Sequence, residues 1–324
     1  MAPLRELILA TLVYHDILNY PMTAWEIFRL QLQPEAQSVK CKVQSYGEVL
    51  AEMETLKRDN VVGERNGFYM LKGREGLYED RILQTKIAEE KWHRVRGAIS
   101  LLRHVPFVRA LALAGSIAMG AAKRGSDIDL FVIAEKNHIW TARFFLTVFA
   151  MLSGKLRSGR ITKLFFPFVR GVREGASVDK LCVNHYVATD ALLLKNQSLF
   201  TASEYARLVP LWGAEVFEKF FKANEWIQGY FPNLVIAAEN RKAEQFSRSS
   251  IQRFFEPPFF RICGVMAEKL LRALQLAFIR KNPLTELGGR IVADDHELAF
   301  HPETPEPKIL DKFGKKMVEL GVLN

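Results

Sequence analysis

Residues 111–134 read LALAGSIAMGAAKRGSDIDLFVIA, two apolar runs joined by a glycine turn and a short basic loop. In a strand, successive side chains alternate between the two faces, so Asp127 and Asp129 project from one face and the apolar residues beside them are buried on the other. Neighbouring carboxylates repel each other, and a hard divalent cation such as Mg²⁺ or Mn²⁺ relieves this repulsion while substrate phosphates complete its coordination shell. The stretch therefore predicts a divalent metal site at the start of a strand.

The segment before the acid pair has the residue types that bind phosphate. Gly115 allows the backbone to approach a ligand closely, and Ser116 offers a hydroxyl and an N–H to phosphate oxygens at the start of a short helix, residues 117–121. Two cations and a second hydroxyl come immediately before the acids: Lys123, Arg124 and Ser126. The spacings of the P-loop and of the dinucleotide-binding glycine motif are absent here. The order of residues predicts a nucleotide phosphate site followed by metal ligands.

This stretch resembles the nucleotidyltransferase fold superfamily, which includes DNA polymerase beta and kanamycin nucleotidyltransferase. The shared pattern is an apolar residue, Gly, then Gly or Ser, a gap of about ten residues, and Asp-apolar-Asp/Glu-apolar. The resemblance as a whole covers roughly residues 90–195. The resemblance implies that Gly115 and Ser116 grip the phosphates of an NTP while Asp127 and Asp129 hold one or two Mg²⁺ ions. It also implies that a nucleoside monophosphate passes to an acceptor hydroxyl with release of pyrophosphate.

The third carboxylate of that superfamily comes from a later strand, and this chain departs from the pattern there. The best candidate strand, residues 180–188, offers Asn184 where an acid is expected, and Asp179 at its edge is the nearest substitute. An asparagine brings no negative charge and cannot act as a base. Alternation predicts that His185 points away from Asn184 and is a packed histidine. The chain is therefore either an active enzyme or a catalytically reduced protein that binds nucleotide as a regulator.

Residues 1–75 are predicted to form a winged helix. Asn66-Gly67 is a strong hairpin signal because both positions tolerate a positive φ. Three amphipathic helices precede the hairpin, at residues 4–18, after Thr23 and at about 44–57. A winged helix suggests DNA binding, but the third helix carries three glutamates that a phosphate backbone would repel. We therefore favour a protein contact or a rigid appendage over a nucleic-acid regulator.

The rest of the chain is predicted as α/β or α+β, a mixed sheet with flanking helices in residues 76–195 and a mainly helical domain in residues 196–324. The first region is expected to open with a long helix at 79–103, and its strands and core helix are expected at 110–114, 128–134, 139–152 and 181–188. The basic segment 155–173 either lines a phosphate site or is a solvated loop. The acidic and histidine residues at 294–301 have no spacing of a known metal site and are interpreted as solvated loop residues.

Composition limits the partners. The net charge of +9 and the pI of about 9.4 favour an anionic partner such as a nucleotide. The three cysteines have no spacing that indicates a disulfide framework or a zinc site. The most apolar run, residues 144–152, is far shorter than the roughly 20 residues that cross a bilayer. We expect a cytoplasmic protein with no membrane partner, whose partners are an NTP and a hydroxyl acceptor on a small molecule, a protein or a nucleic acid.

Overall fold

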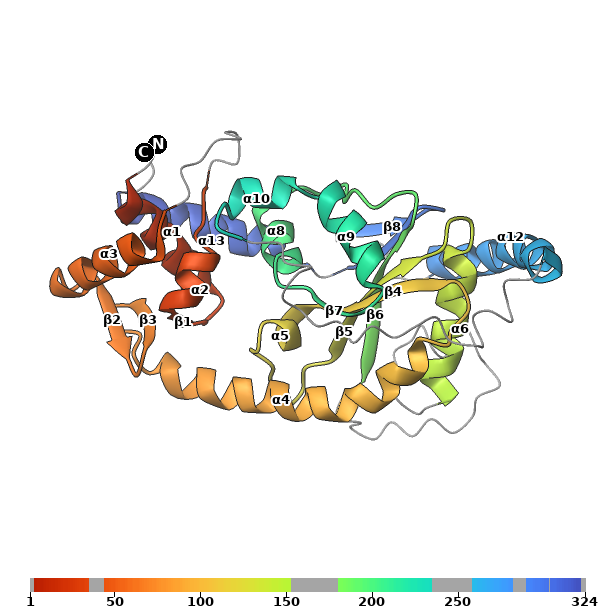
Figure 1. The fold of residues 1–324 in the computed structure, drawn as a ribbon, viewed down its shortest axis with the longest axis horizontal. Helices are drawn as coiled ribbons and strands as arrows, with labels where there is room; N and C mark the ends of the chain where they lie inside the picture. The colour runs from red at the N-terminus through yellow and green to blue at the C-terminus, as the bar shows by residue number, and fades with distance from the viewer. Residues whose placement is uncertain are drawn as a thin grey trace.

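A computed structural model gives the fold in Figure 1 and describes six stretches of the chain. These are residues 3–34, 44–152, 180–234, 258–281, 290–302 and 304–321. Along its longest axis, a small helical unit with its own three-stranded sheet lies at one end and a larger six-stranded sheet flanked by helices lies towards the other (Figure 1). The mixed α and β content predicted from the sequence is confirmed.

The N-terminal unit, residues 3–71, combines three helices with a small antiparallel sheet of order β1-β3-β2. Two of its helices begin with capping boxes, in which Thr23 pairs with Glu26 and Ser45 pairs with Glu48. The β2–β3 turn is at Asn66 and Gly67, which have φ values of 50° and 81°. The unit consists of α1 (Leu4–Ile17), β1 (Met22–Thr23), α2 (Ala24–Arg29), α3 (Tyr46–Arg58), β2 (Val62–Arg65) and β3 (Phe68–Leu71). The predicted helices and hairpin form, and the winged-helix arrangement stays a prediction.

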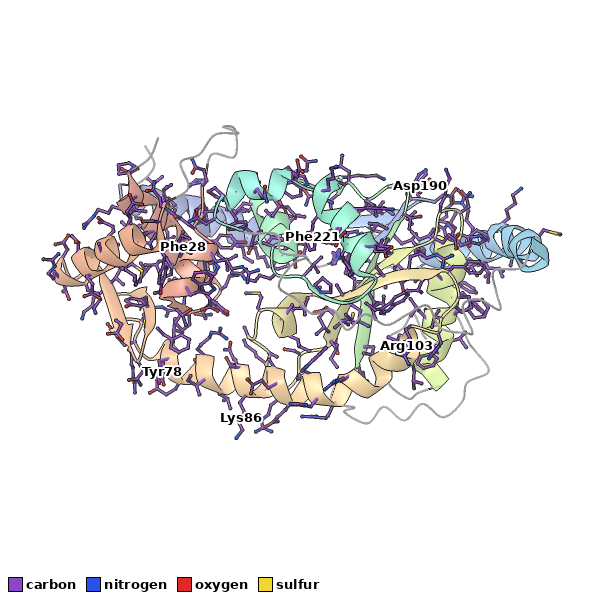
Figure 2. All side chains as sticks on the ribbon, in the orientation of Figure 1. Phe28, Tyr78, Lys86, Arg103, Asp190 and Phe221 are labelled. Carbon is purple, nitrogen blue, oxygen red and sulfur yellow. The ribbon has the colours of Figure 1, made fainter. Side chains whose placement is uncertain are left out.

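Helix α4 (Leu77–Leu102) is the long helix expected between the two parts, and it runs from the N-terminal unit along one side of the larger sheet (Figure 1). Lys86 is exposed on its outer side, directed away from the body of the protein (Figure 2). Arg81 and Lys91 are buried instead, at 7% and 1% exposure. Buried charged side chains require hydrogen-bonding partners, so the inner side of α4 must contact polar groups of a neighbouring segment at these two positions.

The larger sheet has the order β7-β4-β5-β6-β9-β8, with β5 and β6 parallel and the other pairs antiparallel. Strand β5 is central and is buried on its apolar side. The predicted strand boundaries at 128–134 and 181–188 are confirmed. The strands are β4 (Val108–Leu113), β5 (Ile128–Ala134), β6 (Leu181–Ala188), β7 (Val209–Trp212), β8 (Arg290–Ala293) and β9 (Glu297–His301).

Helices cover both faces of this sheet. The face that bears Ile128, Leu130 and Val132 packs against α4, α6 and α12. The opposite face, with Phe131 and Ile133, packs against α8 and α9 and is continuous with the core of the N-terminal unit. The remaining helices are α5 (Gly115–Ala118), α6 (Ile139–Leu152), α8 (Leu199–Tyr205), α9 (Ala214–Ala223), α10 (Trp226–Tyr230), α12 (Pro258–Arg280) and α13 (Glu306–Glu319).

The described residues after residue 195 are mostly helical, but they also include strands that the sequence analysis did not predict. They supply β7, β8 and β9 to the same sheet as β4, β5 and β6. Strand β7 contains Pro210 and lies at the sheet edge, where a proline is tolerated. Helix α13 returns to α1, where Phe313 packs on Tyr14 and Lys316 binds Asp16 (Figure 1). The last helix thus belongs with the N-terminal unit in space.

Among the helices that the structure describes, none combines the length and the apolar character needed to cross a membrane.

Candidate functional site

Gly115 and Asp129 form the centre of the candidate site. Gly115 follows β4 with a φ of +62°, a conformation that favours glycine. A Cβ at this position would lie 2.5 Å from Oδ2 of Asp129. The backbone N–H of Ala114 donates to the carbonyl oxygen of Asp129 at 3.0 Å, which ties the end of β4 to the start of β5. The Asp129 carboxylate therefore lies directly against the glycine bend.

The predicted alternation at the acid pair is confirmed. Ile128 and Leu130 are 0% and 2% exposed, whereas Asp127 and Asp129 are half-buried. Asp127 immediately precedes β5, and the N–H of Ile128 donates to the carbonyl of Lys180 at 2.8 Å, which extends the pairing with β6. The apolar side of the strand is fixed in the core, so Asp129 lies on the opposite face of β5, and Asp127 directly precedes the strand.

The 115–126 loop, which connects β4 to the acid pair, is held by α4 at its middle and at its last residue. Arg81 and Thr85 donate to the carbonyl of Gly120 at 2.5 and 3.2 Å. The ammonium group of Lys91 donates to the carbonyl of Ser126 at 2.7 Å. The buried cations of α4 thus fix the loop backbone, which the sequence patterns did not indicate.

The other predicted phosphate-binding residues lie along this loop. Ser116 is half-buried in α5, and Lys123 and Arg124 are exposed at the loop tip. The Ser126 hydroxyl accepts a hydrogen bond from the N–H of Lys123 at 2.9 Å, which closes a turn. The structure brings all of these residues into one loop beside the acid pair.

The prediction that His185 points to the face opposite Asn184 is wrong. The β5–β6 register pairs Leu130 with Val183 but Phe131 with His185, so Asn184 is an extra residue in β6. Such a bulge reverses the alternation after it. The His185 ring lies 5.3 Å from that of Phe131, on the face of Asp129.

His185 is nevertheless a packed residue. It is 4% exposed, contacts the Tyr205 hydroxyl through Nδ1, and lies 3.1 Å from Glu297 through Nε2. Burial lowers the pKa of His185, and the nearby Arg290 guanidinium lowers it further while Glu297 opposes this. The neutral ring therefore packs between Phe131 of β5 and Tyr205 of α8.

Asn184 lies beside Cys182, the residue in β6 that pairs with Asp129. The Cys182 thiol donates to Asn184 Oδ1 at 2.9 Å, so the amide oxygen already has a partner within the strand. Asp179, the nearest acid in sequence, and the basic segment 155–173 lie outside the described residues.

Glu204 on α8 is a half-buried acid that the sequence patterns did not single out. Helix α8 packs on the Asp129 face of the sheet, because the ring of Tyr205 lies 5.3 Å from that of Phe131. Within the described residues, no hydrogen bond or ion pair of the Glu204 carboxylate is found. The Glu204 carboxylate is thus half-buried without a hydrogen-bonding partner among the described residues.

The pKa of Glu204 depends in part on the charge of Asp129. Burial raises the pKa of Glu204 to about 7. The Arg290 guanidinium opposes the rise, and the negative charges of Asp129 and Glu306 add to it. Strongly perturbed acids beside other charged groups are typical of functional sites.

The acidic cluster at 294–301 has structural partners. Asp294 accepts hydrogen bonds from the N–H groups of His296 and Glu297 and pairs with Lys195. Asp295 accepts from the Trp140 indole and from Arg272. In the part of the chain that the structure describes, no group of three or more His, Cys, Asp or Glu is arranged to hold a metal ion.

Comparison with known proteins identifies the segment that contains this site. A family model described as a nucleotidyltransferase domain matches residues 98–154, which include Gly115, Ser116, Asp127 and Asp129. The match supports the nucleotidyltransferase superfamily for this part of the chain and, in general terms, transfer of a nucleoside monophosphate. No curated protein and no solved structure matches the chain.

Proposed function

We propose that this protein is a Mg²⁺-dependent nucleotidyltransferase that moves a nucleoside monophosphate from an NTP to a hydroxyl acceptor. The observation that carries the proposal is the Asp129 carboxylate against the Gly115 bend, within the segment that matches the nucleotidyltransferase domain. A side chain at position 115 would collide with the Asp129 carboxylate, whereas glycine leaves the backbone accessible for close approach by phosphate oxygens. The bend, the loop and the acid pair together have the features that phosphoryl transfer requires, positioning and charge stabilisation.

The donor set fits Mg²⁺. Asp127 and Asp129 offer hard carboxylate oxygens, and Mg²⁺ is commonly held by one or two carboxylates while substrate phosphates and water complete the shell. When bound, the ion would polarise the phosphate and neutralise charge on the leaving pyrophosphate. Two carboxylates with phosphate and water ligands suffice for Mg²⁺, so the proposed site does not require Asn184 or Asp179 as a third protein ligand.

The chain's own groups have the remaining roles. The backbone at Gly115 and the Ser116 hydroxyl bind the β- and γ-phosphates, and the exposed cations Lys123 and Arg124 offset negative charge on the leaving group. As the acceptor oxygen bonds to the α-phosphorus, the bond from that phosphorus to the bridging oxygen breaks and pyrophosphate leaves. Glu204 takes the proton that the acceptor hydroxyl loses.

The test of this function is pyrophosphate release. Purified protein is incubated with ATP, CTP, GTP or UTP and Mg²⁺ or Mn²⁺, with candidate hydroxyl acceptors, and binding is measured by calorimetry. We expect metal-dependent binding of at least one NTP and pyrophosphate release with a suitable acceptor. Absence of binding for all four NTPs with both metals would refute the proposal.

A catalytically reduced, nucleotide-binding regulator is the second candidate, and the neutral Asn184 in β6 favours it. It predicts nucleotide binding without turnover for any acceptor, and gain of activity in Asn184→Asp. Glu204 favours catalysis instead, because it supplies a carboxylate that β6 lacks.

Glu204→Gln separates these candidates through pH. The carboxylate faces Asp129 on β5, Arg290 on β8, Glu306 on α13 and Tyr14 on α1. Because the pKa of Glu204 is raised from 4.5 to about 7, its ionisation costs stability between those pH values. The variant should therefore be more stable than the wild type above pH 7 and unchanged in this respect below pH 4.5.

The same substitution should lower turnover above pH 7, although it raises stability there. Wild-type turnover should rise as the pH passes about 7, and Glu204→Gln should lose roughly 100-fold and lose this rise. Thermal melting and initial rates from pH 5 to 9 measure both effects. Glu218→Gln, on the exposed side of α9, is the matched control. Equal pH profiles in the wild type and Glu204→Gln would remove Glu204 from the mechanism.

We further propose that the N-terminal unit is a winged helix used for packing within the protein. Its third helix presents acids that pair locally, as Glu52 does with Arg5 and Glu54 with Lys57. Retention on duplex DNA or RNA that weakens steeply with salt would instead favour the nucleic-acid-binding alternative.

A further inference from the structure

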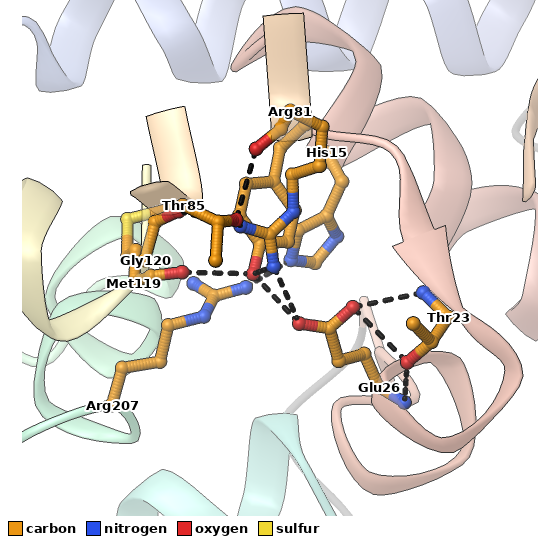
Figure 3. Close-up of polar contacts among 9 residues, drawn as sticks. His15, Thr23, Glu26, Arg81, Thr85, Met119, Gly120 and Arg207 are labelled. Atoms are coloured by element: carbon orange, nitrogen blue, oxygen red, sulfur yellow. Dashed lines mark hydrogen bonds and ion pairs between the residues drawn. The ribbon is translucent and has the colours of Figure 1, made fainter. Parts of the chain in front are cut away.

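Arg81 is the centre of a polar cluster between the N-terminal unit and the 115–126 loop (Figure 3). One of its terminal nitrogens donates to the Gly120 carbonyl at 2.5 Å and to the Thr85 hydroxyl at 2.8 Å. The other donates to the Tyr20 hydroxyl at 2.6 Å and to Glu26 at 3.0 Å. A single, 7% exposed guanidinium thus joins the loop to two residues of the N-terminal unit.

Tyr20 makes its own contact with the loop. Its hydroxyl lies 2.9 Å from the Met119 carbonyl and 2.7 Å from the Glu26 carboxylate. Its ring lies 4.1 Å from the guanidinium carbon of Arg81, a cation–π contact. Burial raises the pKa of Tyr20, and the charge of Glu26 raises it further, so the hydroxyl keeps the proton that it donates.

The loop backbone at this point can occupy few other arrangements. Gly120 has a φ of +66°, and a Cβ there would lie 3.3 Å from Arg81. The N–H groups of Met119, Gly120 and Ala121 all donate back to residues 115–117. The carbonyls of Met119 and Gly120 are therefore fixed from outside while the amides fix the loop from within.

The other anchors of the cluster are rigid elements. Glu26 also closes the capping box of α2 with Thr23, at 2.8 Å from its N–H. Arg207, directly beyond α8, contacts Nε2 of buried His15 on α1. Burial, with the Arg207 charge in addition, lowers the pKa of His15, so the neutral ring can accept this hydrogen bond.

We infer that the N-terminal unit holds the 115–126 loop in its nucleotide-binding geometry through Tyr20 and Arg81, which act as positioning residues for NTP affinity. The inference rests on the proposed function, and it assigns to the N-terminal unit a role in nucleotide binding at a distance from the reacting atoms. A loop that is already ordered does not lose conformational entropy when the nucleotide binds. When the contacts are removed, a smaller fraction of the protein is competent to bind, and the apparent Kd rises in inverse proportion to that fraction.

Tyr20→Phe tests this role with the smallest change, because it keeps the buried ring and removes the hydroxyl. Arg81→Gln removes the guanidinium. Arg74→Gln is the matched control, because Arg74 also joins two residues of the N-terminal unit, Asp16 and Asn19, at 2.8 and 2.6 Å. We measure hydrogen exchange of the amides at 119–121 for all variants, well below their melting temperatures. Calorimetry gives the Kd of each of the four NTPs in the presence of Mg²⁺ for the same proteins.

Tyr20→Phe should speed exchange at 119–121 and weaken NTP binding by about three- to ten-fold, and Arg81→Gln should weaken it more. The kcat at saturating NTP should stay within about two-fold, because bound nucleotide restores the loop geometry. Arg74→Gln should change neither exchange nor Kd. A wild type that binds no NTP would refute the proposed function. Unchanged exchange at 119–121, or an unchanged Kd in a wild type that does bind NTP, would overturn the positioning role.

Discussion

Asp129→Asn should reduce pyrophosphate release at least about 100-fold while leaving the fold intact. Asparagine has nearly the same shape, and the hydrogen bond that joins this residue to Ala114 uses the backbone carbonyl, so the β4–β5 connection is kept. The change removes a negative charge from the proposed metal site, and charge is what holds a hard cation there. Initial rates with saturating NTP and Mg²⁺ measure the loss, and melting curves establish that the variant is folded.

Asp127→Asn should have an effect of the same order, because both acids are proposed to share one ion. Asp190→Asn is the matched control. Asp190 (Figure 2) follows β6, which is parallel to β5, so it lies beyond the opposite end of these strands from the acid pair, and it pairs with Lys136 at 3.3 Å. The control should retain wild-type rates. Full activity in either Asp127→Asn or Asp129→Asn would contradict the assignment of these carboxylates.

Gly115→Ala is the second change with a large expected effect. A non-glycine residue at φ +62° costs roughly 1–2 kcal/mol, and the new Cβ would overlap the Asp129 carboxylate oxygen, which lies 2.5 Å away. The carboxylate has to move, and a misplacement on the order of 1 Å can cost about 100-fold in rate. We therefore expect a lower melting temperature together with loss of most NTP-dependent turnover.

Gly125→Ala is the control for this variant. Gly125 lies in the same loop, and a Cβ there meets no atom within 4 Å. Its melting temperature and turnover should stay close to those of the wild type. If Gly115→Ala behaves like Gly125→Ala, the bend is not a close-approach site.

The sequence alone predicted the central strand and the orientation of the acid pair. These follow from two-residue periodicity between buried neighbours, and periodicity is a local property of the chain. The capped helices of the N-terminal unit and the turn at Asn66 were predictable for the same reason, because capping boxes and positive-φ turns are set by adjacent residues.

The missed features depend on contacts between distant segments. The bulge at Asn184 places His185 on the Asp129 face. No residue type in β6 predicts this change of register. Nothing in the local sequence distinguishes Glu204 from a solvated acid in a short helix. Its burial near Asp129 arises only when α8 packs on the sheet. Arg81 and Lys91 read as surface residues of a charged helix, although both are buried against the 115–126 loop.

A crystal of the protein with Mn²⁺ and a non-hydrolysable NTP analogue would locate the metal through its anomalous signal. We expect a Mn²⁺ peak bound by both Asp127 and Asp129 and by phosphate oxygens, with the phosphates against the backbone at Gly115. Nucleotide bound elsewhere, or a metal that contacts neither aspartate, would contradict this expectation.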